Sequence, residues 1–157
     1  MILTHYQKLL DYNLWSNKLS FDAGQSLKGD VSKQYNRIFS HILAAERVWY
    51  NRVTNNPKYR MQVWEELETH EIPLFVFRNY EDWKKLLLET APDKIIQYTD
   101  SFGEIHESSF LDIITHLINH GSSHRSQLNR VLRQNKIEPP VIDYIYYVID
   151  GLELTNS

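Results

Sequence analysis

The sequence predicts an all-α protein, a four-helix bundle with a small hairpin before the last long helix and a short C-terminal segment. Two observations favour this fold class. Apolar residues recur three or four positions apart over long segments, as they do on one face of an α-helix. Glycine and proline are scarce, with five of each in 157 residues. That length suits one domain able to bury a core without disulfides, so we expect a single domain over residues 1–157.

The first two helices are expected over about residues 2–21 and 32–53. Each carries apolar side chains at helical spacing and is followed by a residue that ends helices. Gly24 follows the first helix. Pro57 follows the second, and proline cannot continue the hydrogen bonding of a helix.

The chain after the second helix is expected to be less regular. Residues 64–67 are interpreted as a short helical turn, and residues 72–77 as an extended apolar connection. The third helix is expected to start near Tyr80, and its apolar pattern continues past a kink or break at Pro92.

A hairpin centred on Gly103 is expected over residues 98–107. The fourth helix follows over about residues 109–134, with Ser108 or Ser109 as its N-cap and an aspartate in its first turn. After a Pro-Pro pair, a short apolar segment closes the chain.

Three of the seven histidines border the apolar face of their helices. His120 and His124 lie one turn apart beside the apolar stripe of the fourth helix, and His41 borders the stripe of the second. His116 lies further round the fourth helix, so we interpret it as a solvated histidine, or as one that contacts a metal-binding histidine without binding the metal itself.

An i, i+4 pair of imidazoles can bind one ion, and a third imidazole from a facing helix completes a three-nitrogen face. Such a face leaves a position for water or substrate, as catalytic metal sites do. The predicted ligands are His41, His120 and His124. Imidazole suits zinc, nickel, copper or iron, so the ion stays open. The alternative is that these histidines are structural and satisfied by ordinary hydrogen bonds.

Arg125 falls inside the apolar stripe of the fourth helix, where a cation must be paired or must line a pocket or interface. Asp143 is the hypothetical partner. Trp15, Trp49 and Tyr146 are most simply core residues, although aromatic rings near an open metal face can also hold a substrate.

Composition excludes several other classes of protein. The net charge is −3 with both signs mixed, so nothing indicates a nucleic-acid surface. No apolar run approaches the roughly 20 residues that a membrane span needs. Cysteine is absent and the first residues do not read as a signal peptide, so a cytoplasmic location is expected.

Five short motifs resemble, in order, those of the DinB-like (DinB/YfiT) metal-binding proteins. Residues 119–127, NHGSSHRSQ, resemble the signature NHxxxHRGQ, and residues 41–49, HILAAERVW, resemble HxxxAxxxW. Residues 12–17 resemble YxxWAN, residues 101–104 resemble the hairpin, and residues 139–144 match PPxxDY. The resemblance spans nearly the whole chain.

The resemblance implies a four-helix bundle in up-up-down-down order, often a homodimer, with a divalent metal on His41, His120 and His124. Ser126 replaces the usual glycine of the signature and Ser16 replaces an alanine, and neither is a ligand position. Relatives of known activity look like transferases or isomerases that use a low-molecular-weight thiol.

The leading hypothesis is therefore a metal-dependent enzyme, with zinc or nickel, that transfers a low-molecular-weight thiol to an electrophilic small-molecule substrate. The first alternative is a metal-dependent hydrolase, for which Glu46 is weighed as general base although it lies five residues beyond His41. The second is a non-catalytic metal-binding or stress-related bundle in which the ion only braces the helices.

Overall fold

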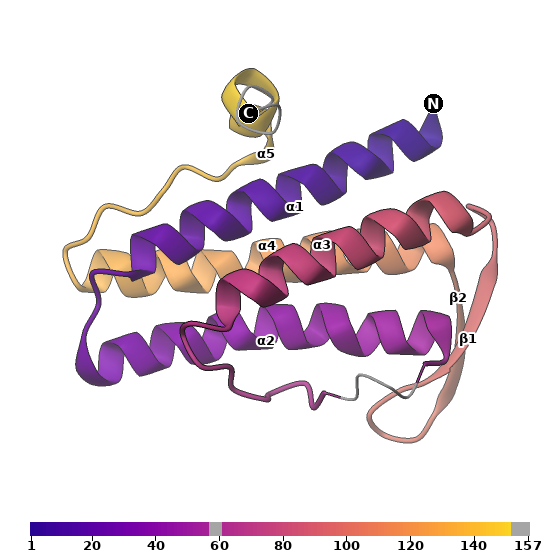
Figure 1. Cartoon of the computed structure of the whole chain (residues 1–157), viewed down its shortest axis with the longest axis horizontal. Coiled ribbons are helices and arrows are strands. Elements are labelled where there is room, and N and C mark those ends of the chain that lie inside the picture. The colour runs from indigo at the N-terminus through magenta and orange to yellow at the C-terminus, as the bar shows by residue number, and fades with distance from the viewer. Residues whose placement is uncertain (57–60, 152–157) are drawn as a thin grey trace.

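The computed structural model describes residues 1–56 and 61–151, and this part of the chain is mostly helical. Its long helices confirm the predicted all-α bundle (Figure 1). They are α1 (Ile2–Gly24), α2 (Gly29–Thr54), α3 (Ile72–Glu89) and α4 (Phe110–Gln134).

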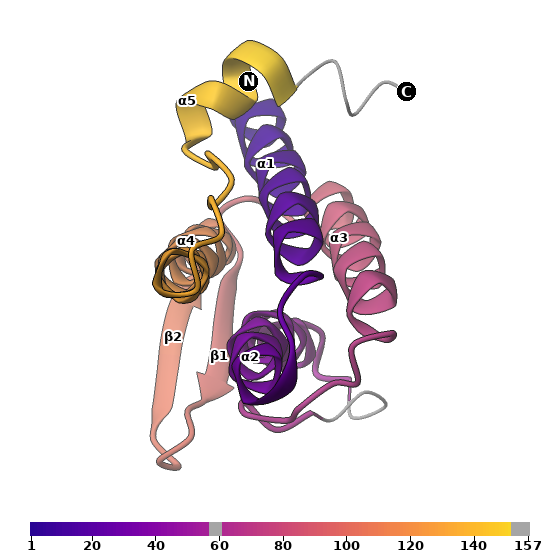
Figure 2. The ribbon, with the colours of Figure 1, turned by 90° about the vertical axis from the view of Figure 1, so that its left-hand side faces the viewer.

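The four helices stand at the corners of a square, with α1 diagonal to α2 and α3 diagonal to α4 (Figure 2). Helices α1 and α4 run in one direction, and α2 and α3 run in the other (Figure 1). This order is up-down-down-up and differs from the up-up-down-down order that the resemblance implied. The short link 25–28 reverses the chain between α1 and α2, whereas residues 61–71 run back along the bundle before α3 begins.

Helix α3 begins at Ile72, so the prediction of an extended connection over residues 72–77 is wrong. Proline lies in the first turn of α3, where its missing N–H group has no helical partner to lose. The consecutive apolar residues suggested an extended apolar connection, but they form the first turns of a helix, and Leu74 and Phe77 are exposed. The buried side chains follow helical spacing instead, at Ile72, Val76, Asn79, Trp83 and Leu87.

The hairpin consists of β1 (Ile95–Thr99) and β2 (Ile105–Ser109), paired antiparallel with Tyr98 opposite His106. Gly103 lies in its turn with φ of 88°, a value that favours glycine. The predicted turn is confirmed, but the apolar residues after Pro92 belong to β1 and do not extend the third helix. The hairpin covers the end of the bundle where α2 finishes and α4 starts (Figure 1).

Helix α4 begins after Ser109 and ends at Gln134, as the sequence predicted. Ser109 is the N-cap of α4, and its hydroxyl oxygen accepts a hydrogen bond of 3.1 Å from the Asp112 amide. Helix α2 ends at Asn55 in the left-handed conformation, with φ of 51°, and the predicted stop at Pro57 lies outside the described residues.

The C-terminal segment forms α5 (Tyr144–Tyr146) and the π-helical turn η2 (Tyr147–Gly151) beside α1 (Figure 2). The Tyr12 hydroxyl donates a hydrogen bond of 2.9 Å to the Ile142 carbonyl and ties this segment to the bundle. Tyr147 is fully buried, but Tyr146 is 45 % exposed, so the prediction that Tyr146 is a core residue is wrong.

The apolar core divides into two clusters along the bundle. One joins α1, α3 and the first half of α4 around Trp83, Phe110 and Ile114. The other joins the first half of α2, around Phe39, to the second half of α4, around Leu128. Within residues 1–56 and 61–151, no helix is long and apolar enough to cross a membrane.

Candidate metal centre

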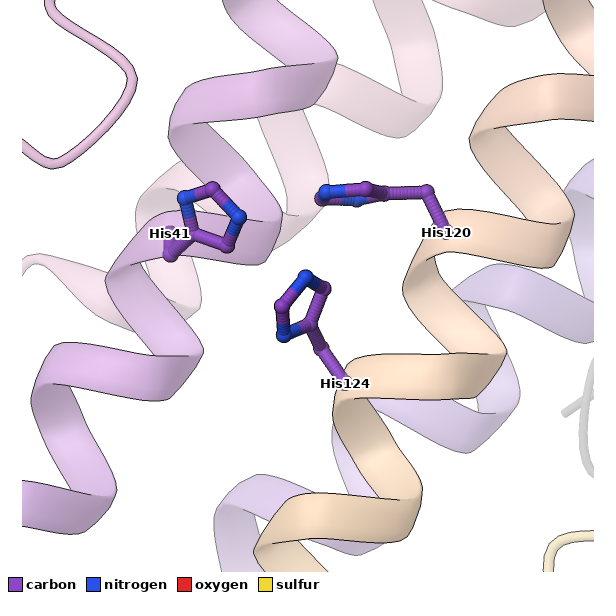
Figure 3. A group of neighbouring side chains, drawn as sticks. All are labelled: His41, His120 and His124. Atoms are coloured by element: carbon purple, nitrogen blue, oxygen red, sulfur yellow. The ribbon is translucent and has the colours of Figure 1, made fainter.

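His41, His120 and His124 lie together in the groove between α2 and α4, and their rings point toward one another (Figure 3). One nitrogen of each ring lies within 4.8 Å of a nitrogen of the other two. The ring centroids of His41 are 5.0 Å from His120 and 4.5 Å from His124. The i, i+4 spacing on α4 places the rings of His120 and His124 one turn apart, and the antiparallel helix α2 supplies the ring of His41.

The ring of His41 is held in a defined orientation. Its Nδ1 atom lies 2.7 Å from the Val63 carbonyl oxygen. Because a carbonyl can only accept a hydrogen bond, Nδ1 carries the proton and Nε2 keeps its lone pair. The Trp64 ring stacks on His41 with centroids 3.7 Å apart and planes 10° apart. Residues 63 and 64 form a turn, so the helical turn expected over residues 64–67 is wrong.

Two histidines of the cluster, His41 and His120, favour the neutral form. Burial, followed by the neighbouring imidazoles, lowers the pKa of His120 from 6.5 to about 4. Burial also lowers the pKa of His41, against the opposing effect of the Val63 carbonyl. Neutral imidazole is the form that binds metal, so the cluster holds its lone pairs ready near pH 7.

His124 carries a buried polar atom that the described residues do not satisfy. Its Nδ1 atom is buried and has no hydrogen-bond partner among them. A buried nitrogen without a partner costs free energy. Three imidazoles fit zinc, nickel, copper or iron, and the chain has no cysteine to add a thiolate.

His116 stays outside the cluster, as its position on the helix indicated. Its side chain is exposed, with its ring centroid 5.7 Å from His120 and 5.2 Å from Trp49. Among the other histidines, His106 lies on the hairpin with Nε2 3.0 Å from an Asp100 carboxylate oxygen. The structure therefore brings together the three predicted histidines and no other histidine of the described chain.

Glu46 lies in a buried polar network inside the bundle. One carboxylate oxygen accepts a hydrogen bond of 2.8 Å from the Asn13 amide, and the other accepts one of 2.9 Å from the Asn79 amide. Burial raises the pKa of Glu46, and the two amides and the charge of Arg125 oppose this rise. Because both oxygens are engaged by fixed donors, Glu46 is not placed as a free general base.

Arg125 belongs to the same network, and the structure gives it partners other than Asp143. Its NH1 group donates hydrogen bonds of 2.8 Å to the side-chain oxygens of both Asn13 and Asn17. Arg125 is fully buried, whereas Asp143 is exposed, so the hypothetical pair is wrong. Gly121 provides the space that the Arg125 side chain occupies, since a Cβ atom at position 121 would lie 2.9 Å from NH1 of Arg125.

The sequence interpretation missed Trp64 and the supporting residues of the network. Trp64 lies in an irregular loop, where no periodicity indicates which way a side chain points. Asn13 and Asn79 had a usable signal, because each is a polar residue at an apolar position of its helix. Polar residues at such positions on several helices indicate a buried hydrogen-bonded network.

Comparison with known proteins agrees with the geometry. The model of the DinB family matches residues 2–150. "Protein DinB" of Bacillus subtilis (strain 168) is 22% identical over 158 residues, covering 90% of this chain and 92% of that protein. No solved structure matches the chain.

Proposed function

The chain belongs to the DinB family, and we propose that it is a metal-dependent enzyme that transfers a low-molecular-weight thiol to an electrophilic small molecule. The observation that carries the proposal is the cluster of His41, His120 and His124, whose ligand atoms lie within 4.8 Å of one another. The proposed ion is zinc or nickel, and the three histidines are its proposed ligands.

The chain's own residues prepare the site for such an ion. The Val63 carbonyl and the Trp64 ring fix His41, and the lowered pKa of His120 keeps its lone pair free. A bound divalent ion supplies a Lewis acid that favours the thiolate form of a coordinated thiol. Because the sequence has no cysteine, no thiol of the protein competes for that position.

The proposed reaction balances without any oxidant or reductant. The sulfur of the small thiol forms a new bond to the electrophilic carbon. The bond from that carbon to its leaving group breaks, and the leaving group keeps the electron pair. The proton of the thiol passes to solvent.

Hydrolysis has less support. It requires a general base near the ion to take a proton from water. Glu46, the candidate that the sequence offered, is engaged by Asn13 and Asn79 inside the bundle. The reading as a non-catalytic bundle differs in a measurable way, since a bracing ion would hold much of the folding free energy.

We propose further that the protein is a cytoplasmic homodimer. The dimer rests on the family resemblance, and the location rests on the absence of cysteine. Analytical ultracentrifugation of the purified protein at several concentrations tests the dimer. A single species with the mass of one chain would contradict it.

The test of the proposed function is a conjugation assay on protein loaded with zinc or nickel. Several low-molecular-weight thiols are each paired with an electrophile whose leaving group absorbs light. We expect turnover with at least one thiol, none above background in His41→Ala, and unchanged turnover in His70→Ala, which removes an exposed histidine outside the cluster. Equal rates for the loaded protein and His41→Ala with every thiol would contradict the proposal.

Thermal melting before and after chelation separates an ion that acts in a reaction from one that braces the fold. We expect chelation to remove the ion and to leave most of the melting temperature, because two apolar clusters hold the bundle. Collapse of the fold on chelation would favour the bracing role instead.

A further inference from the structure

A second group of side chains lies between the histidine cluster and the hairpin. The exposed His116 ring lies 5.7 Å from His120 on one side and 5.2 Å from Trp49 on the other. Trp49 in turn lies 4.8 Å from Tyr98 on β1, by ring centroids. The rings therefore form an unbroken aromatic path from the cluster to the hairpin.

Arg52 stands at the end of this path. Its guanidinium carbon lies 4.6 Å from the Trp49 ring centroid and 5.7 Å from the Tyr98 ring centroid. Arg52 follows His41 by eleven residues on α2, which places it on the same face of the helix about 16 Å further along. His41 of the cluster and Arg52 thus lie on the same face of α2.

An open cavity of about 860 Å³ adjoins Arg52, between the end of α2 and strand β1. Tyr98, Gln97 and Thr99 line its hairpin side. In Figure 1 the hairpin lies across the end of the bundle where α2 finishes. The volume is within the range of small-molecule sites.

The charge of Arg52 has no counter-ion within ion-pair distance across residues 1–56 and 61–151. Asp100 is the neighbouring carboxylate, but the turn already engages both of its oxygens. One accepts hydrogen bonds from the Phe102 and Glu104 amides, and the other lies 3.0 Å from His106. A half-buried guanidinium beside an open cavity is a ready partner for a carboxylate.

Resting on the proposed function, we infer that Arg52 binds a carboxylate of the low-molecular-weight thiol while the sulfur of that thiol reaches the histidine cluster. The aromatic rings of Trp49 and His116 line the stretch between the two ends. The substrate class is therefore an extended thiol acid, long enough to span about three turns of α2.

The test uses a chemical ruler on protein loaded with cobalt, whose near-ultraviolet absorption reports contact with sulfur. Mercaptopropionate, mercaptohexanoate and mercaptoundecanoate are titrated by calorimetry and by absorption. Mercaptoundecanol is the matched control, since it has the thiol and the chain but not the carboxylate. Protein variants are Arg52→Gln, Arg52→Lys and Arg37→Gln, the last an exposed arginine earlier on α2.

We expect mercaptoundecanoate to bind wild type about tenfold tighter than mercaptoundecanol, the size of one hydrogen bond to a charged group. Mercaptopropionate is too short to show this gain over a neutral thiol. The gain disappears in Arg52→Gln, is partly kept in Arg52→Lys and is unchanged in Arg37→Gln. Melting curves of each variant establish that it is folded.

The two readouts separate failure of the inference from failure of the proposed function. Equal affinity of the long acid for wild type and Arg52→Gln, with the cobalt–sulfur absorption present, overturns the inference alone. An Arg52-dependent affinity without that absorption overturns the thiol chemistry and keeps the carboxylate site. Absence of binding in both readouts overturns both.

Discussion

Two polar regions lie inside this bundle, and they are built in opposite ways. In the network around Glu46, each carboxylate oxygen accepts a hydrogen bond from an amide, and Arg125 donates to the amide oxygens of Asn13 and Asn17. In the histidine cluster, by contrast, the rings face one another and none donates to another. Among the residues that the structure describes, the side-chain hydrogen bond of the cluster runs outward, from His41 to the Val63 carbonyl.

This difference in hydrogen bonding indicates different roles for the Glu46 network and the histidine cluster. The network around Glu46 joins helices through hydrogen bonds among its own side chains, and only Nε and NH2 of Arg125 in it have no partner among the described residues. A cluster that keeps neutral lone pairs pointing at a common centre gains only when an ion arrives. We therefore expect changes in the network to alter stability and not metal binding, and changes in the cluster to do the reverse.

The largest expected effect on stability comes from the network. Arg125→Met removes a buried charge and leaves Asn13, Asn17 and Glu46 without it, at a cost of about 3–5 kcal/mol. For a chain of this size the melting temperature falls roughly 2–4 °C for each kcal/mol. Arg133→Met, an exposed arginine on the same helix, is the control. Unchanged stability in Arg125→Met would break the contrast.

A smaller effect is expected at the point where the two regions adjoin. In Gly121→Ala the new Cβ would lie 2.9 Å from Arg125 NH1 and 3.1 Å from the Asn13 amide oxygen. Overpacking costs about 1–3 kcal/mol, and the better helix propensity of alanine returns up to about 1 kcal/mol. Urea unfolding should show a net loss, with Ser122→Ala, at an exposed position, as control. A stabilised Gly121→Ala would show that the network shifts freely.

The stability of the cluster should depend on pH. With metal removed, His120 in the folded chain takes a proton only near pH 4, while the unfolded chain takes it near 6.5. The unfolded state therefore binds more protons between these values, and stability falls as pH drops from about 6.5 to 4. Urea midpoints across this range should fall less steeply for His120→Asn. Parallel slopes for the two proteins would contradict the assignment.

The smallest effect is expected from the ring that covers His41. Trp64→Ala removes a stacked contact worth about 0.5–1.5 kcal/mol, so metal affinity should fall a few-fold. Trp64→Phe, which keeps a flat ring, should recover most of it. Calorimetric titration with zinc makes the comparison. Equal affinity in all three proteins would mean that the Val63 carbonyl alone orients His41.

Periodicity predicted most of the fold because most of this chain is long amphipathic helix. The three histidines could be placed for the same reason, since their positions relative to apolar stripes fix where they point. Periodicity failed over residues 72–77 and after Pro92, where short apolar runs do not distinguish helix, strand and connection. The extent of the domain, 1–157, stays a prediction.

The partners of individual side chains depended on packing between helices, which a single helical wheel does not contain. Arg125 was placed correctly inside the bundle, yet its partners Asn13 and Asn17 come from α1, more than a hundred residues earlier. Trp64 and the Val63 carbonyl come from a turn without regular structure. The same limit applies to Arg52, whose setting depends on where the hairpin folds back.

Metal analysis after reconstitution with zinc or nickel and removal of loosely bound ion tests the central claim most directly. The account predicts one ion per chain in the wild type, in His70→Ala and in Arg125→Met where it remains folded. It predicts loss of that ion in His41→Ala, with weakening beyond the roughly 10–100-fold that loss of an outer partner of a ligand costs. A wild-type protein that retains no ion, or a His41→Ala protein that retains it fully, would contradict the account.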